Sequence, residues 1–178
     1  MVLLIVGAMV FTAGLSYRYL VGLAVIVGPL LYLVLATAPY RRNRLAAVLD
    51  PWDDPLGSGY QIIQSLISIG SGGVAGVGLM EGQQKLFYLP EPHTDFIFAV
   101  LGEELGLIGT VAVLGLFGVF MWRGLRSSWK APDQFGSYLA LGITMMVALQ
   151  AFINMSVVLG LLPTKGIPLP FLSYGGSS

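Results

Sequence analysis

Four apolar segments dominate the chain, and polar residues gather in the stretches between them. The segments cover about residues 1–15, 19–38, 96–122 and 138–162. A helix rises about 1.5 Å per residue, so about 20 residues cross a hydrocarbon core of about 30 Å. The last three segments reach that length, and the first would need further residues upstream. The pattern predicts an all-α fold, a polytopic bundle of transmembrane helices with about four spans present.

The connections between these segments differ greatly in length. Residues 16–18 form a tight turn, residues 123–137 are short and basic, and residues 39–95 form a long loop rich in Gly, Pro and Ser. Four crossings put the two short connections on one side, and the long loop and a final loop of residues 163–178 on the other. Because short loops rich in Lys and Arg favour the cytoplasm, we expect the long loop to be extracytoplasmic.

The composition also indicates a membrane protein. Of 178 residues, 56% are hydrophobic and only 10% are charged, whereas soluble domains carry about a quarter charged residues. The net charge of zero argues against a nucleic-acid partner, which requires a basic face. Cysteine is absent, so there is neither a disulfide framework nor a thiol nucleophile. Because the chain opens inside an apolar run and ends at SYGGSS, we expect it to be a piece of a larger protein.

A cluster of titratable residues borders the third apolar segment. The stretch LPEPHTDFIFAVLGEELGL, residues 89–107, contains the only histidine, His93, and four of the nine acidic residues. Asp95 stands where the apolar run begins. It is either a helix cap, since a carboxylate suits the free N–H groups there, or a catalytic residue. His93 either orients the loop or shuttles protons, and without a second histidine it cannot build a histidine metal site.

Two further carboxylates, Glu103 and Glu104, lie inside the apolar run. On a helical wheel Glu103 falls about 80° from Asp95, and Glu104 points to the opposite side. Carboxylates this deep normally face a cavity or a partner, so an ion pair with an arginine on a helix missing from this chain is an alternative to a site. Three glycines fall within about 40° of the Asp95 direction: Gly102, Gly106 and Gly109. This stripe predicts either a close helix contact or the floor of a cleft.

The glycine-rich residues 70–82, GSGGVAGVGLMEG, do not form a nucleotide-binding motif. No Gly-Lys-Ser/Thr follows, and the match to G-x-G-x-x-A lacks a strand–helix–strand context. We expect irregular backbone that is buried against protein or lines a cavity. The acids of DPWDD are expected in a solvated turn. Lys165 in the final loop either meets an anionic head group or is an ordinary interfacial lysine.

Three stretches carry a family resemblance: DPLGSGYQIIQSLISIGSGG, QKLFYLPEPHTDFIFAVLGEELG and GLLPTKGIPLPFLSYGGSS. In order and spacing they resemble the SEDS family (shape, elongation, division and sporulation), and the resemblance extends over essentially the whole chain. QKLFYLPE and PTKG resemble the division branch, FtsW, and the sporulation branch, SpoVE, more than the elongation branch, RodA. GLMEGQQK departs from the serine-containing stretch common in FtsW. The family has about ten spans, and this chain resembles the C-terminal half, roughly the sixth to ninth.

The resemblance implies a peptidoglycan glycosyltransferase of the bacterial cytoplasmic membrane, active on the extracytoplasmic side. It would polymerise lipid II into β-1,4 glycan strands during cell division or cell-wall growth, with a class B penicillin-binding protein and other division or elongation proteins as partners. The family's essential aspartate matches Asp95, which would be the general base on the acceptor hydroxyl. Cations and a divalent ion, Mg²⁺, would steady the pyrophosphate. The substrate-binding candidates are Lys85, Glu91, His93, Thr94, Arg41, Arg44, Lys165 and Glu103.

Two other functions remain open from the sequence. A lipid II flippase or transporter would need charge along a path through the membrane midplane, whereas the charges here gather at its border, which favours the polymerase. A non-catalytic scaffold of the division machinery would tolerate substitution of Asp95. Because missing helices would complete the cavity, we expect this chain alone to be inactive.

Overall fold

The computed structural model describes residues 2–37, 44, 46–57, 59–82 and 95–174. Its elements are α1 (Val2–Thr12), α2 (Tyr17–Thr37), the 3₁₀ helix η1 (Pro51–Asp53), α4 (Tyr60–Gly72), α6 (Ile97–Lys130) and α7 (Gln134–Val158). The prediction of an all-α fold is confirmed for this part of the chain. Helices α6 and α7, of 34 and 25 residues, are long and apolar enough to cross a membrane, whereas α1 is shorter. The predicted total of about four spans stays a prediction.

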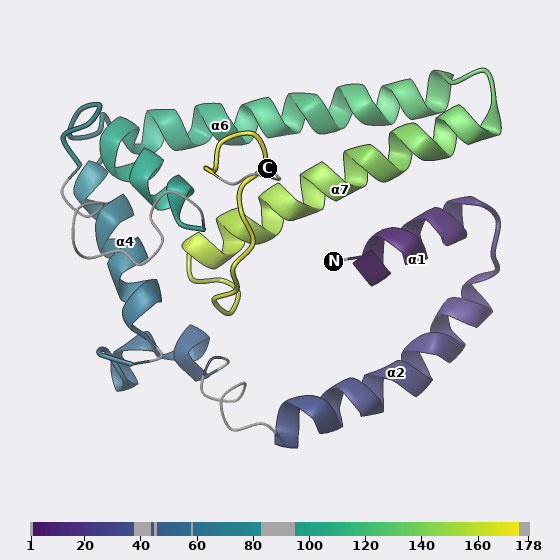
Figure 1. Ribbon diagram of the computed structural model, residues 1–178, viewed down its shortest axis with the longest axis horizontal. Helices are drawn as coiled ribbons and strands as arrows, with labels where there is room; N and C mark the ends of the chain where they lie inside the picture. Colours follow the sequence, from purple (N-terminus) through teal and green to yellow (C-terminus); the bar gives the residue numbers. More distant parts are fainter. Residues whose placement is uncertain (1, 38–43, 45, 58, 83–94, 175–178) are drawn as a thin grey trace.

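Helices α6 and α7 form a long antiparallel hairpin (Figure 1). Helix α6 continues to Lys130 rather than ending near residue 122, so the connection expected over residues 123–137 is mostly helical. The helix stops at Ala131, whose extended ψ of 135° fits a residue that precedes a proline. Helix α7 then begins with the Asp133 carboxylate accepting a hydrogen bond from the Gly136 N–H at 2.7 Å, a side-chain cap for the new helix.

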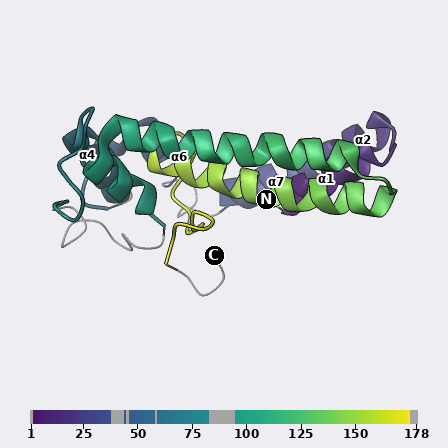
Figure 2. The same cartoon turned by 90° about the horizontal axis from the view of Figure 1, so that it is seen from above.

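Helix α6 is not straight, because its backbone breaks at Gly106 (φ 64°, ψ −159°). Figures 1 and 2 show the short first arm, residues 97–105, leaving the long second arm at a steep angle. The third apolar segment therefore forms two helical arms rather than one straight helix. The helical wheel drawn from Asp95 fails for the same reason past Gly106.

The glycine-rich segment of residues 73–78 fills this break. In a continuous helix the N–H groups of residues 107 and 108 would bond to the carbonyls of residues 103 and 104. Here they bond to Gly73 O and Val74 O at 2.9 and 3.2 Å. The carbonyls of Glu103 and Glu104 accept instead from the N–H groups of residues 77 and 78, at 3.0 and 3.2 Å. These four backbone groups, which a continuous helix would pair with one another, thus each find a partner in the glycine-rich segment. The expectation of irregular backbone is confirmed for residues 73–82, whose backbone bonds to α6, whereas residues 70–72 belong to α4. The expected burial is not found for Val74, Leu79 and Met80, whose side chains are exposed.

Two glycines of the predicted stripe make close contacts with the same region. A side chain at Gly72 would collide with the Gly102 carbonyl, and one at Gly106 would collide with the backbone of Val74 and Gly76. The close-contact alternative is therefore confirmed for Gly102 and Gly106. Their partner is α4 and the segment after it, an element that the sequence analysis treated as loop.

The hydrophobic core lies where the first arm of α6, the end of α7 and the final segment meet. Leu169, from that final segment, is fully buried in the core. The other members come from the two helices: Phe96, Phe98, Ala99, Ala151, Met155 and Val158. This cluster fixes the start of α6 against the end of α7.

The remaining helices flank the hairpin. Helix α1 packs against α7, with the Met9 sulfur next to Gly142. Helix α2 stands apart from the α6–α7 hairpin in Figure 1, and its large apolar side chains are exposed, among them Val25 and Ile26. The 13–16 and 131–133 turns lie at one end of the molecule, and α4 lies at the other (Figures 1 and 2).

Candidate functional site

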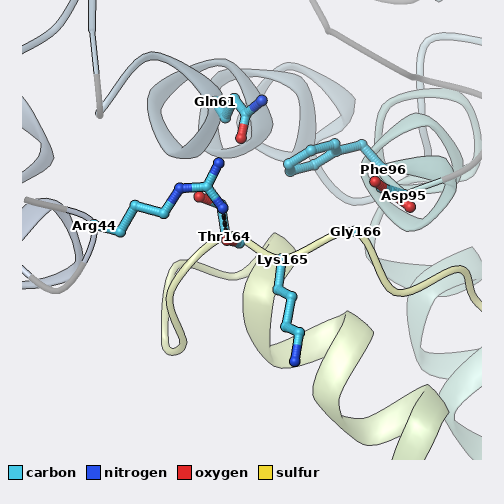
Figure 3. Close-up of a pocket in the computed structure, with 7 residues that line it drawn as sticks. All are labelled: Arg44, Gln61, Asp95, Phe96, Thr164, Lys165 and Gly166. Atoms are coloured by element: carbon cyan, nitrogen blue, oxygen red, sulfur yellow. Dashed lines mark hydrogen bonds between the residues drawn. The ribbon is translucent and has the colours of Figure 1, made fainter. Parts of the chain in front are cut away.

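A pocket of about 140 Å³ lies at the end of the molecule that carries α4. Four separate parts of the chain build it: the stretch before η1, α4, the start of α6 and the final segment (Figure 3). Its lining residues are Arg44, Gln61, Asp95, Phe96, Thr164, Lys165 and Gly166. The pocket thus brings together three of the residues selected from the sequence, Arg44, Asp95 and Lys165.

Asp95 stands two residues before the first residue of α6, Ile97, and is partly buried. The N-cap position of α6 belongs to Phe96, which makes no side-chain capping bond, so Asp95 is not the N-cap residue. The Phe96 ring is buried in the core and anchors this end of the helix. The Asp95 carboxylate lies against Gly166, where an added Cβ would come within 2.8 Å of Oδ2. The carboxylate therefore borders the pocket beside the bare backbone of the final segment.

Arg44 joins the long loop to the final segment. Its Nη1 donates a hydrogen bond to the Thr164 carbonyl at 2.6 Å, across 120 residues of sequence. This contact holds a guanidinium at the pocket wall. Gln61 of α4 supplies a neutral amide to the same wall (Figure 3). The pocket therefore combines one carboxylate with a cation and an amide, groups suited to a polar, anionic ligand.

Lys165 lines the pocket through its position next to Thr164, but its side chain is exposed. In Figure 3 the side chain extends away from Asp95. Arg44, which Thr164 holds at the pocket wall, is therefore the better-placed candidate for binding an anion in this conformation.

Glu103 lies outside the Asp95 pocket, in the first arm of α6, with its side chain against α4. Its side chain is 3% exposed, and its Oε2 is 3.4 Å from the Ser68 hydroxyl, which also donates to the Ala99 carbonyl at 3.1 Å. Glu103 is not among the residues that line the Asp95 pocket. Its described contacts make it part of the α4–α6 junction.

Asn154 and Gln150, one turn apart on α7, hold the final segment in place. The Asn154 Nδ2 donates to the carbonyls of Asp95 and Ile167 at 2.8 and 2.7 Å. The Gln150 Nε2 donates to the Pro168 carbonyl at 2.9 Å. Sequence reasoning missed both residues, although two amides four positions apart in an apolar helix were a visible signal.

Several predicted residues lie outside the described part of the chain: Arg41, Lys85, Glu91, His93 and Thr94. The acids of DPWDD lie in a turn as expected, where the Asp50 carboxylate accepts from the Trp52 N–H at 3.0 Å. Within the described residues no group of three or more His, Cys, Asp or Glu side chains could hold a metal. Asp95 is the one acid that these residues bring to the pocket, so they do not form an Mg²⁺ site by themselves.

The structure is helical, with two helices long and apolar enough to cross a membrane and a polar pocket at one end of the hairpin that they form. The family of FtsW, RodA and SpoVE, described as "Cell cycle protein", matches residues 1–178. The chain belongs to this family.

Individual relatives agree with this assignment. The chain is 53% identical over 170 residues to the "Probable peptidoglycan glycosyltransferase FtsW" of Geobacter metallireducens, covering 96% of this chain and 45% of the relative. It is 56% identical over 175 residues to the "Stage V sporulation protein E" of Bacillus subtilis, covering 96% and 46%. The chain thus spans about half the length of the curated relatives it matches.

A solved structure shares the fold. It is reported as "Structural coordination of polymerization and crosslinking by a peptidoglycan synthase complex". It superposes with a TM-score of 0.74 at 31% sequence identity, covering 99% of this chain and 48% of that chain.

Proposed function

We propose that the protein is a peptidoglycan glycosyltransferase that polymerises lipid II into β-1,4 glycan strands, with Asp95 as the catalytic base. The observation that carries this proposal is the Asp95 carboxylate in a pocket with Arg44. The pocket belongs to a chain more than half identical to relatives named as peptidoglycan glycosyltransferases. The protein acts as a multi-pass protein of the bacterial cytoplasmic membrane, with this pocket on the extracytoplasmic side.

The chemistry needs one base. The donor sugar is α-linked to undecaprenyl pyrophosphate and the product is β-linked, so a single inverting displacement suffices. Asp95 takes the proton from the 4-hydroxyl of the acceptor N-acetylglucosamine as that oxygen attacks the donor's anomeric carbon. The bond to the pyrophosphate breaks at the same time and leaves its electrons on the phosphate oxygen. A pyrophosphate needs little acid assistance, so the second carboxylate of water-using glycosidases is not required.

The leaving pyrophosphate needs positive charge near it. Arg44 is suited to this, because a guanidinium binds phosphate oxygens in a bidentate manner. Lys165 would contribute by swinging its exposed side chain towards the pocket. Lys85 and Arg41 remain candidates from the sequence. A bound Mg²⁺ also remains a candidate, with ligands supplied largely by the substrate phosphates.

Replacement of the carboxylate tests the proposal. Asp95→Asn removes the base while keeping nearly the same size, so the purified full-length protein should still fold and bind its partner. We expect its polymerisation of lipid II to fall by at least about 100-fold, measured as glycan chains on a gel. The matched control is Asp53→Asn, at an exposed carboxylate in η1 outside the pocket, which should retain full activity. Normal polymer from Asp95→Asn would remove Asp95 from the mechanism.

A second substitution at Asp95 separates the alternative functions. A scaffold would support division with Asp95→Ala in place of the natural residue, whereas the polymerase would not. A flippase would move labelled lipid II across vesicle membranes without making polymer.

A class B penicillin-binding protein is the partner we infer for cross-linking, and co-purification of the two proteins from membranes tests that inference.

A further inference from the structure

Asn154 lies at the contact between the two chain segments that border the pocket. It sits in the last turns of α7 and is only 2% exposed. Its Nδ2 donates to the backbone carbonyl of Asp95, 59 residues earlier, and to that of Ile167, 13 residues later. One side chain therefore binds the segment carrying the carboxylate and the segment carrying Thr164, Lys165 and Gly166.

The chemistry of the contact requires an amide nitrogen. Both partners are carbonyl oxygens, which only accept hydrogen bonds, and an asparagine Nδ2 has two hydrogens to give. The Asn154 Oδ1 is buried without a partner among the described residues, so the nitrogen alone carries the connection. A hydroxyl has one hydrogen and could satisfy only one of the two carbonyls. An aspartate would place a carboxylate oxygen, which has no hydrogen to donate, next to both carbonyl oxygens.

Gln150 supplies a built-in comparison. It lies one turn before Asn154 on the same helix and also donates to the final segment, at Pro168. Its described hydrogen bond goes to the final segment and not to Asp95. Loss of Gln150 should therefore loosen the final segment alone, whereas loss of Asn154 should release both segments.

We infer that Asn154 is a positioning residue, which fixes the Asp95 carboxylate relative to the Thr164–Gly166 wall of the pocket through its two amide hydrogen bonds. This inference rests on the proposed function of Asp95 as a base. Asn154 does not touch the substrate. It sets the distance between the base and the wall against which the acceptor hydroxyl and the pyrophosphate are held, and small displacements of such groups are costly in rate.

The kinetic test uses the full-length protein with its partner. Asn154→Ala should lower kcat for lipid II polymerisation by about 10- to 100-fold per folded molecule, while KM for lipid II changes by less than about 3-fold. Asn154→Asp, which keeps the shape and removes the donor, should lower kcat at least as much. Gln150→Ala should retain kcat within about 3-fold. Wild-type kcat in both Asn154 variants, or an equal loss in Gln150→Ala, would overturn the inference.

A second measurement does not depend on catalysis. Backbone hydrogen exchange should rise in residues 95–101 and 164–170 of Asn154→Ala, and only in residues 164–170 of Gln150→Ala. Unchanged exchange near Asp95 in Asn154→Ala would overturn the inference even if its kcat fell. Absence of polymer from the unsubstituted protein would instead contradict the proposed function, and the exchange data alone would then decide the positioning role of Asn154.

Discussion

Gly166 leaves no room for a side chain beside the Asp95 carboxylate. A methyl group there would lie 2.8 Å from Oδ2, too close for an unstrained contact. The atom that must move is the end of a flexible side chain, so Gly166→Ala should change the free energy of unfolding by less than about 1 kcal/mol. The displaced carboxylate should lower kcat by about 10- to 100-fold. Denaturant unfolding and a lipid II polymerisation assay measure the two effects.

A glycine in α6, outside the pocket, provides the control for this substitution. A Cβ at Gly115 would meet nothing within 4 Å. Gly115→Ala should therefore leave both the stability and kcat close to those of the natural protein. If Gly166→Ala polymerised lipid II as fast as Gly115→Ala, the contact between the final segment and Asp95 would have no role in catalysis.

The residues of the pocket differ in how well their roles could be predicted from the sequence. Asp95 could be found because a carboxylate at the start of an apolar run is conspicuous. Arg44 and Lys165 were found as cations but could not be ranked, because only the contact with Thr164 shows that Arg44 is held at the pocket. Asn154 was missed because it is uncharged, and its role depends on two carbonyls remote from it in sequence.

At the scale of elements, the break in α6 depends on a residue without a side chain. The conformation of Gly106 is strained for any other residue, and an added Cβ would lie 2.7 Å from the Val74 carbonyl oxygen. Gly106→Ala should lower the free energy of unfolding by at least about 3 kcal/mol, since backbone strain and a collision with backbone add together. The measurement is denaturant unfolding of the purified protein in detergent.

The matched control for the break is Gly118→Ala, in the second arm of the same helix. Its Cβ would have open space, and alanine is the better helix former by about 1 kcal/mol. This variant should be as stable as the natural protein or slightly more stable. Equal stability of Gly106→Ala and Gly118→Ala would mean that the two-armed form of α6 is not a fixed feature of the fold.

The elements also show where the pattern of apolar residues is insufficient. The apolar run beginning at residue 96 correctly predicted a helix but could not show its break, because residues on both sides of Gly106 are mainly apolar. The long loop concealed α4, an amphipathic helix that buries Ile62, Ile63 and Ser65. Its glycine- and serine-rich sequence is typical of loops, and the helix is stabilised by packing against α6.

At the scale of the whole molecule, the two ends should face opposite sides of the membrane. Leu56, in the turn between η1 and α4, is 89% exposed, and Pro132 is exposed in the turn between α6 and α7. The chain contains no cysteine, so Leu56→Cys and Pro132→Cys each introduce one unique thiol into it. In a full-length protein otherwise free of cysteine, a membrane-impermeant maleimide should label Leu56→Cys in intact spheroplasts, and Pro132→Cys only after permeabilisation.

The reverse labelling pattern would have a clear consequence. It would put the Asp95 pocket on the cytoplasmic side, where it could not polymerise lipid II on the outer surface. A cysteine at exposed Asp53, close to Leu56 in the same turn region, should label in the same way as Leu56→Cys and controls for local reactivity.

The sequence by itself determined those properties that depend on residues close to one another along the chain. Hydropathy and the helical period decide which segments become apolar helices, and the few charges mark the border where Asp95 stands. Three motifs in order were enough to predict the family, which the comparisons confirm.

The tertiary structure decided what those residues do together. The break at Gly106 is stable because distant backbone groups replace the lost helical hydrogen bonds. The pocket exists because Arg44 meets Thr164 across 120 residues, and Asn154 meets Asp95 across 59. Such contacts follow from how the helices pack in space, and no local pattern along the chain encodes them.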